Sequence, residues 1–350
     1  MKKILSILLI GVFILSLAAC SKGQTNEQGY YSKLNVYNWG DYIDPQVLED
    51  FEKEYGIKVN YENYANNEEM LAKIQAGGTE YDVIFPSEYM VEAMINQGLL
   101  LELDMNNLSN FKNIGEEFKG LPYDPDNKYS VPYFWGTMGI IYNTRKVKGE
   151  IDSWSVLWDE QYKGDILMLD SSRDTIGITL KKLGYSLNTR NLEELEKAKE
   201  ELMKQKPLVK AYEVDAYKDM MIAGEAAMAL TWSGDAMLLI EENPDLAYVI
   251  PKEGTNLWFD TMAVPTTSKH KREAELFIDY MMRPEVAAKC AEYVMYATPN
   301  EEAKKLLPED VVENELAYPK GNIMNKGEVF IDLGEFTTEY DRVWTEIKAK

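Results

Sequence analysis

The stretch LWFDTMAVP at residues 257–265 decides the expected fold, because it is apolar or aromatic at nearly every position and predicts a β-strand. Side chains alternate between the two faces of a strand, so Trp258 and Asp260 are expected on the same face. An indole ring beside a carboxylate suits an organic cation, because the ring attracts the charge and the carboxylate accepts its N–H groups. The alternative is a core Trp beside an Asp in a solvent-exposed turn.

The N-terminus has the layout of a secretory leader. Two lysines precede an apolar run from residue 4 to residue 17, and the small-residue sequence LAAC at 17–20 ends in Cys20. This sequence resembles the lipobox of bacterial lipoproteins, in which the signal peptide, here residues 1–19, is removed and the cysteine is lipidated. The alternative is an ordinary secretory signal that happens to end in cysteine.

Residues 20–32 are expected to form a flexible tether, because residues 22–29 contain no apolar side chain large enough to pack. No later run of the sequence is long and apolar enough to span a bilayer. We therefore expect an extracytoplasmic protein that is lipid-anchored through Cys20 to the outer face of the cell membrane, or held in the periplasm, and not embedded.

The mature chain is strongly acidic. The whole sequence has a formal net charge of −22, and without residues 1–19 it has 35 basic against 59 acidic side chains, a charge of −24. This excess argues against nucleic acid as a partner and mildly favours a cationic ligand. Cys290 has no expected disulfide partner, and the single His270 lies in a basic run. We expect no metal site and no cofactor.

The first part of the mature chain alternates strands and helices. Strands are predicted at residues 34–37, 57–61 and 82–85, with helices at about 45–55 and 68–76 between them. This order predicts an α/β fold with a largely parallel sheet and helices on both faces. The ligand site of such a sheet lies beyond the carboxyl ends of its strands.

A long β run at residues 129–142 separates this series from a second α/β series. The run contains two glycines, which predicts a crossover between two lobes where the glycines absorb rotation. The stretch 257–265 is the expected return crossover. The predicted division places residues 33–135 and 262–307 in lobe 1, and residues 136–261 and 308–350 in lobe 2.

Several motifs along the chain resemble, in order and spacing, the spermidine/putrescine-binding proteins of bacterial polyamine ABC importers. The resemblance covers about residues 33–348, and its most specific part is PKEG-xxx-W-x-D. The motifs are NWGDYI at 38–43, PSEY at 86–89, SVPYFWGTMGI at 130–140, WSGDA at 232–236, PKEGTNLWFD at 251–260 and YATPN at 296–300.

The resemblance implies a type II periplasmic-binding-protein fold whose two lobes close on an extended polyamine. Acidic residues would pair with its amines, and aromatic rings would enclose its methylene chain. The contacts implied motif by motif are Trp39, Tyr42, Ser87, Tyr89, Asp174, Trp232, Trp258, Asp260 and Tyr296.

The sequence departs from the family pattern at three places. Ser171 stands where the family has the first acid of a pair, Phe330 lies where it has a glutamine, and Gly40 lies where some members have a hydroxyl residue. The preference between putrescine and spermidine therefore does not follow. Two carboxylates, Asp170 and Asp215, are further candidate contacts.

The expected function is that of a monomeric, non-enzymatic substrate-binding lipoprotein that captures polyamines and delivers them to the membrane permease subunits of an ABC importer. One alternative is a binder of a quaternary amine such as betaine, and another is a polyamine sensor. A hydrolase that uses Asp174 and Asp260 as its acid pair is also conceivable, but the sequence has no signature of an activated nucleophile.

Overall fold

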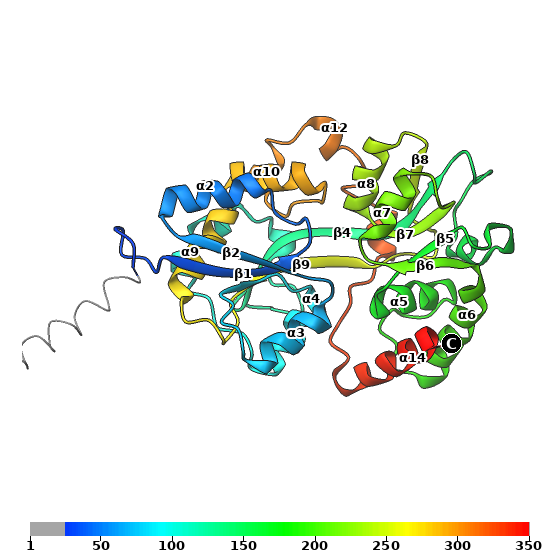
Figure 1. The fold of residues 1–350 in the computed structure, drawn as a ribbon, viewed down its shortest axis with the longest axis horizontal. Helices are drawn as coiled ribbons and strands as arrows, with labels where there is room; N and C mark the ends of the chain where they lie inside the picture. The colour runs from blue at the N-terminus through cyan, green and yellow to red at the C-terminus, as the bar shows by residue number, and fades with distance from the viewer. Residues whose placement is uncertain (1–24, 350) are drawn as a thin grey trace, which may run out of the picture.

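The protein consists of two α/β lobes that lie side by side and are linked by long strands (Figure 1). The computed structural model describes residues 25–349. The expected signal peptide and Cys20 lie outside this range. Within it, no helix combines the length and the apolar character that a membrane crossing requires.

Lobe 1 contains the parallel strands that the sequence predicts. β1 pairs in parallel with β2 and with β3, and the sheet order continues through β9 and β4 into the second lobe. The strands are β1 Lys33–Trp39, β2 Lys58–Tyr64, β3 Val83–Ile84 and β9 Leu257–Ala263. The helices are α2 Pro45–Tyr55, α3 Asn67–Ala76, α4 Glu88–Asn96, α9 Lys271–Met281 and α10 Pro284–Val294.

Local sequence signals explain the boundaries of α2. Asp44 caps its N-terminus, where the carboxylate accepts a 2.8 Å hydrogen bond from the backbone N–H of Gln46, and Pro45 occupies the first helical position. The helix ends at Gly56, whose φ of 65° is in the left-handed region that favours glycine. The helix predicted at about residues 45–55 is confirmed.

β4, Ser130–Asn143, connects the two lobes. Its first part pairs antiparallel with β9, and its second part pairs antiparallel with β7 and β8. Figure 1 shows β4 and β9 running together from one lobe toward the other. The crossover arrangement is thus present, while the exact division at residues 135/136 and 261/262 remains our proposal.

Lobe 2 repeats the α/β pattern. β5 pairs in parallel with β6 and with β7. The strands are β5 Ile166–Leu169, β6 Val209–Glu213, β7 Met228–Trp232 and β8 Leu246–Val249. The helices are α5 Ser172–Lys182, α6 Leu192–Gln205, α7 Ala216–Ile222, α8 Ser233–Glu242 and α14 Thr337–Ala349. β6 was not predicted, because this strand at the end of the sheet is only partly buried and carries two charged residues.

The C-terminal part of the chain returns to lobe 2. Three short helices, α11 Glu301–Lys304, α12 Glu309–Val312 and α13 Asn322–Lys326, lead to α14. α14 packs against α5 and α6 around a separate apolar core that includes Leu195, Leu202 and Tyr340. Helix α5, whose first turn contains the candidate Asp174, is therefore packed against both α6 and α14.

Residues 25–32, expected within a flexible tether, contact lobe 1. The Asn26 side chain donates a 2.6 Å hydrogen bond to the carbonyl of Tyr55 at the C-terminus of α2. The Tyr31 ring stacks on His270, with ring centroids 3.6 Å apart. The polar composition of the segment concealed these long-range contacts, which the sequence pattern could not predict.

Candidate functional site

A cavity of about 340 Å³ lies between the two lobes. Its walls come from the ends of β1, β3, β5 and β7 and from β9, which is where a two-lobed α/β fold is expected to bind ligands. All the principal candidates from the sequence line it, namely Trp39, Tyr42, Ser87, Tyr89, Asp174, Trp232, Trp258, Asp260 and Tyr296.

Asp260 is buried in this cavity and is only 7% exposed. Its Oδ2 accepts a 2.5 Å hydrogen bond from the Tyr42 hydroxyl, and its Oδ1 accepts a 2.6 Å hydrogen bond from the Ser87 hydroxyl. Burial raises the pKa of Asp260 to about 6, although both hydrogen bonds act to lower it. Within residues 25–349, no basic side chain forms an ion pair with this carboxylate.

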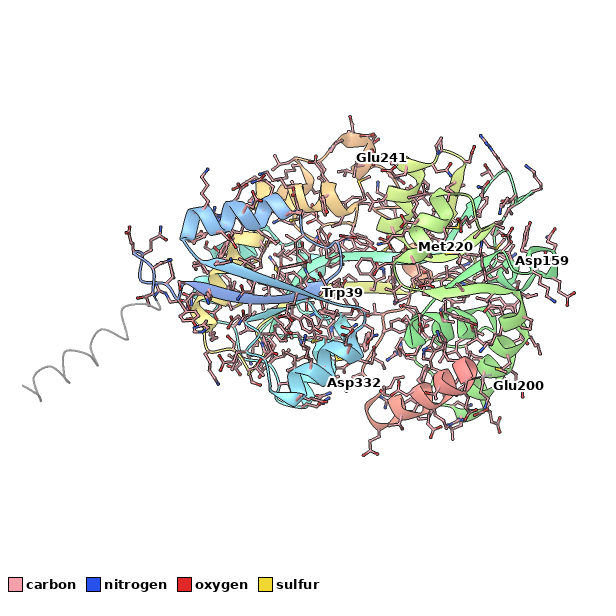
Figure 2. The ribbon with its side chains drawn as sticks, viewed as in Figure 1. Trp39, Asp159, Glu200, Met220, Glu241 and Asp332 are labelled. Atoms are coloured by element: carbon pink, nitrogen blue, oxygen red, sulfur yellow. The ribbon has the colours of Figure 1, made fainter. Side chains whose placement is uncertain are left out.

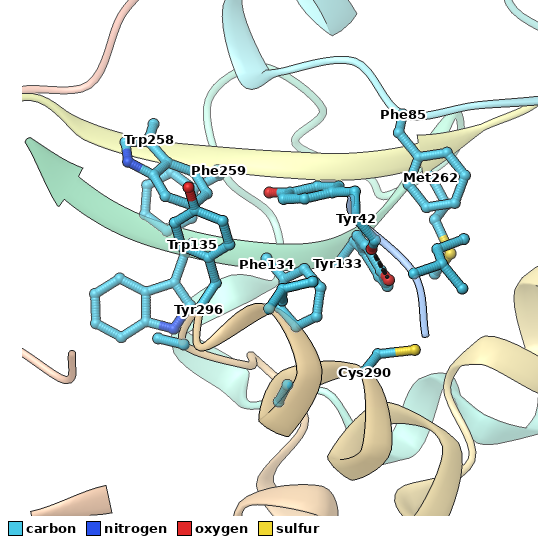
Figure 3. Packing of buried hydrophobic residues seen from close by; sticks show 14 of the residues in the cluster. Tyr42, Phe85, Tyr133, Phe134, Trp135, Trp258, Phe259, Met262, Cys290 and Tyr296 are labelled. Carbon is cyan, nitrogen blue, oxygen red and sulfur yellow. Dashed lines mark hydrogen bonds between the residues drawn. The ribbon is translucent and has the colours of Figure 1, made fainter. Parts of the chain in front are cut away.

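Aromatic rings form the wall beside Asp260. Trp258 and Tyr296 meet edge to face with centroids 5.0 Å apart, and Tyr42 and Tyr296 do so at 5.7 Å. Figure 3 shows these three rings gathered against β4 and β9. Trp258 and Asp260 both line the cavity while Phe259 between them does not, so the predicted shared strand face is confirmed.

Two glycines allow these rings to lie close to the backbone. A Cβ on Gly136 of β4 would be 2.5 Å from Trp258 Cζ2, and a Cβ on Gly234 would be 2.2 Å from Tyr296 Cδ1. In the same way, a Cβ on Gly139 would be 2.4 Å from the Tyr248 ring. The glycines of β4 thus make room for aromatic rings, which is a packing reason that the sequence interpretation did not include.

Trp39 ends β1 at the junction of the lobes, as Figure 2 shows. Its indole N–H donates a 2.8 Å hydrogen bond to the carbonyl of Phe85, which also accepts a 2.6 Å bond from the Tyr64 hydroxyl. These bonds fix the indole in the cavity wall. Its polar atom is satisfied by protein, so the ring offers an apolar face to a ligand.

A second carboxylate, Asp174, comes from lobe 2 and is half-buried. Ser171 caps α5, and its hydroxyl donates a 2.7 Å hydrogen bond to Asp174 Oδ2. Burial raises the pKa of Asp174 to about 6, against the lowering effects of Ser171 and of the neighbouring Arg173. Ser171 therefore acts at the cavity as a hydrogen-bond donor to Asp174.

Arg173 lies beside Asp174. It was not identified from the sequence as a site residue, because a charged side chain in the first turn of a helix is usually exposed to solvent. It is 4% exposed, and its guanidinium lies over the rings of Phe330 and Tyr89, 4.5 and 5.0 Å from their centroids. Phe330 lines the cavity and supports this guanidinium. The Arg173 stack also connects lobe 2 to Tyr89 of lobe 1.

Several further acidic residues line the cavity that were not among the sequence candidates, and two of them, Glu68 and Asp235, accept hydrogen bonds from tyrosines of the site. Glu68 accepts a 3.0 Å hydrogen bond from the Tyr89 hydroxyl, and burial raises the pKa of Glu68. Asp235 accepts hydrogen bonds from the hydroxyls of Tyr217 at 2.6 Å and Tyr296 at 3.0 Å. The position of Asp235, in the first turn after the β7 strand end, was a signal that could have identified it.

The structure corrects the prediction for Asp170, which does not line the cavity. Its carboxylate forms a 2.9 Å ion pair with Lys348 of α14, which holds it on the surface of lobe 2. The other additional candidates do line the cavity. A Cβ on Gly40 would lie 4.0 Å from Asp215 Oδ2, so the segments after β1 and before α7 face each other across the junction of the lobes.

The site has the chemistry of a cation-binding cavity for an organic ligand. Both carboxylates and aromatic rings line its walls. Across the part of the chain that the structure describes, there is no cluster of His, Cys, Asp and Glu side chains suited to a metal ion.

A family model for bacterial extracellular solute-binding proteins matches residues 46–319. The chain belongs to this family. The match spans parts of both lobes and includes most of the residues that line the cavity.

Relatives of this solute-binding protein are similar to it over nearly their full length. The spermidine/putrescine-binding periplasmic protein of Salmonella typhimurium is 38% identical over 90% of this chain and 91% of its own. The structure of the spermidine/putrescine ABC transporter substrate-binding protein of Streptococcus pneumoniae is 43% identical, with a TM-score of 0.78, over 91% of this chain and 99% of its own. The Tp0655 lipoprotein of Treponema pallidum is 25% identical, with a TM-score of 0.81, over 91% and 100%. The expected two-lobed binding-protein fold is thus confirmed.

Proposed function

We propose that this solute-binding protein captures polyamines, spermidine or putrescine, outside the cell membrane and delivers them to the permease subunits of an ABC importer. The ligand class comes from the names of its relatives. The chemistry of the cavity supports the same class.

The observation that carries the proposal is the burial of Asp260 without a basic partner among the residues that the structure describes. It is a buried carboxylate whose protein partners are two hydroxyl groups, so its negative charge is uncompensated when it is ionised. Leaving such a charge unpaired is costly, and a ligand ammonium relieves that cost with a charge-assisted hydrogen bond. The edge-to-face rings beside it provide an apolar surface for methylene groups.

The arrangement favours primary and secondary amines over quaternary amines. A trimethylammonium group has no N–H to donate, so it would leave the lone pairs of Asp260 without a new partner. Betaine would also bring its own carboxylate into a cavity lined by Asp174, Asp235 and Asp260. We therefore place the quaternary-amine alternative below polyamine binding.

The proposal is for binding and transport without catalysis, because the relatives are substrate-binding proteins. We further propose a monomer that is anchored through a lipid on Cys20. The relative from Treponema pallidum is itself a lipoprotein, which supports this anchoring. A sensor role would use the same cavity and differs only in the membrane partner.

A thermal-shift screen of the mature protein tests the ligand class. Putrescine, spermidine, spermine, cadaverine and betaine are compared with a no-ligand control at equal ionic strength. We expect stabilisation by putrescine or spermidine, of ~2.7 kcal/mol at a hundredfold excess over Kd. Stabilisation by betaine alone would contradict the proposal, and so would no response to any of the amines.

A further inference from the structure

We propose that Lys218 is a specificity-determining residue, a cation tethered inside the cavity that competes with a ligand ammonium for Asp235. This inference rests on the proposed polyamine binding and goes beyond it, because it says how the cavity limits the number of positive charges it accepts.

Lys218 lies on α7 and lines the cavity together with Asp215 and Asp235. Its ammonium is 3.2 Å from Asp215 Oδ1, and its side chain is 24% exposed whereas that of Asp215 is 67% exposed. The partner of Lys218 is therefore a well-hydrated carboxylate, and such an ion pair is weak. The lysine is held near the cavity without being locked in place.

The nearby Asp235 is the better-buried carboxylate of this region and is 7% exposed. Tyr217, the residue before Lys218 on α7, donates a 2.6 Å hydrogen bond to Asp235, so this carboxylate lies against the helix that carries Lys218. Tyr296 donates a second hydrogen bond to it, so Asp235 resembles Asp260 in having two hydroxyl partners. Burial acts to lower the pKa of Lys218, but attraction to Asp235 and Asp215 outweighs it and leaves the pKa raised. The ammonium of Lys218 thus remains charged in the field of Asp235.

The other cation of the cavity wall is bound differently. The Arg173 guanidinium donates hydrogen bonds to the carbonyl of Ile331 at 3.3 Å and to the Asn188 side chain at 3.0 Å, and it stacks on aromatic rings. It is a fixed part of the wall. Lys218 has a flexible stem and an exposed ion-pair partner, so it can withdraw or compete when a ligand arrives.

The consequence concerns ligand charge. A diamine places two ammonium groups in the cavity, whereas a triamine must also place a third. An ammonium that reaches Asp235 meets the charge of Lys218, and like charges in a partly buried site repel. Lys218 therefore disfavours the additional charge of spermidine relative to putrescine.

The experiment measures the Kd of putrescine and of spermidine by calorimetry for the wild type, Lys218→Gln, Lys218→Arg and Lys163→Gln. Lys163 is exposed and outside the cavity, so its variant is matched in charge change. We expect Lys218→Gln to bind spermidine about fivefold more tightly, which corresponds to ~1 kcal/mol, with a smaller gain for putrescine. Lys218→Arg and Lys163→Gln should keep the wild-type ratio of the two constants.

The proposal is overturned if Lys218→Gln binds spermidine no more tightly than the wild type, or if both ligands gain equally. Melting temperatures without ligand show whether each variant is folded. If the Gln variant is not folded, Lys218→Met, which also removes the charge, takes its place with the same expected gain for spermidine. A wild-type protein that binds neither amine would instead refute the proposed function, so the two failures are distinguishable.

Discussion

The Tyr42 hydroxyl donates a 2.5 Å hydrogen bond to Asp260 Oδ2, although the two residues are 218 positions apart in the chain. Tyr42 follows the first strand of lobe 1, and Asp260 lies on the returning β9. The Tyr133 hydroxyl in turn donates a 2.8 Å bond to the backbone carbonyl of Tyr42. The cavity is therefore organised in advance around one carboxylate.

Replacing Asp260 by Asn should weaken polyamine binding without unfolding the protein. The substitution keeps the shape and removes the charge, so the loss should be ~2–5 kcal/mol, and at least about tenfold in Kd. Calorimetry with spermidine measures it. The matched control is Asp170→Asn, since Asp170 pairs with Lys348 outside the cavity and its loss should leave the affinity unchanged. Equal affinities for the Asp260→Asn variant and the wild type would remove the basis of the proposed site.

Polyamine affinity should fall as the pH is lowered through about 6. Burial raises the pKa values of Asp260 and Asp174 to about 6, so both become protonated below that value and can no longer pair with an ammonium. Calorimetry at about pH 5 and about pH 7.5 compares the two states. The Asp260→Asn variant should show a flatter pH dependence, because one titrating group is gone.

The same pKa shifts predict how the stability of the ligand-free protein depends on pH. An unfolded Asp has a pKa of about 3.9, so between about pH 4 and pH 6 the unfolded chain releases protons that the folded state keeps at Asp260 and Asp174. Their contribution to the free energy of unfolding therefore decreases as the pH rises through this window. Glu88 and Glu68, whose pKa values are also raised, act in the same direction. Thermal unfolding of the wild type and of the Asp260→Asn variant across this range measures the Asp260 part.

Gly136→Ala should destabilise the protein and weaken binding together. The new Cβ would lie 2.5 Å from Trp258 Cζ2 and 2.6 Å from Ser233 Oγ, so the indole must move. Overpacking of this kind costs ~1–3 kcal/mol. Gly78→Ala is the control, because its Cβ would meet nothing within 4 Å and should change stability by less than about 0.5 kcal/mol. An unchanged Trp fluorescence and Kd in Gly136→Ala would show that the close approach has no role at the site.

Ligand should draw the two lobes together. β4 and β9 cross between the lobes, and the Arg173 guanidinium of lobe 2 lies over the Tyr89 ring of lobe 1, so side chains of the two lobes also meet at the cavity. The radius of gyration from X-ray scattering should decrease when spermidine is added. No decrease at saturating ligand would indicate a rigid, preformed cavity.

Cys20→Ala tests the anchoring. If Cys20 is the lipidated residue, the variant should be released into the medium or remain an unprocessed precursor. Membrane fractionation and metabolic labelling with a fatty acid measure this. A variant that is processed and membrane-bound at the wild-type level would contradict the lipid anchor.

Much of the site follows from short-range patterns. Strand periodicity placed Trp258 and Asp260 on one face, and βα order placed Trp39 and Ser87 at strand ends that meet in one cavity. The chemistry of a carboxylate among rings could also be inferred from residue types. These features depend on neighbours within one element or on a regular sheet.

What the sequence did not reveal depends on contacts between distant elements. Arg173 is buried because Phe330 and Tyr89 arrive from other parts of the chain, and no local pattern distinguishes it from a surface arginine. Asp170 likewise lies outside the cavity because it forms an ion pair with Lys348 of α14, which is distant in the chain. Their neighbours, and with them the placement of single side chains, become visible only once the fold is assembled.

The docking of residues 25–32 on lobe 1 has a mechanical consequence for a protein attached at Cys20. Only four residues lie between that cysteine and Thr25, the first residue that the structure describes, so a lipidated Cys20 would lie within roughly 17 Å of Thr25 beside lobe 1. Lobe 1 would then be the stationary half, held near the bilayer at the end where Tyr31 stacks on His270. Each capture and release of a ligand would then move lobe 2 relative to a lobe 1 that stays in place.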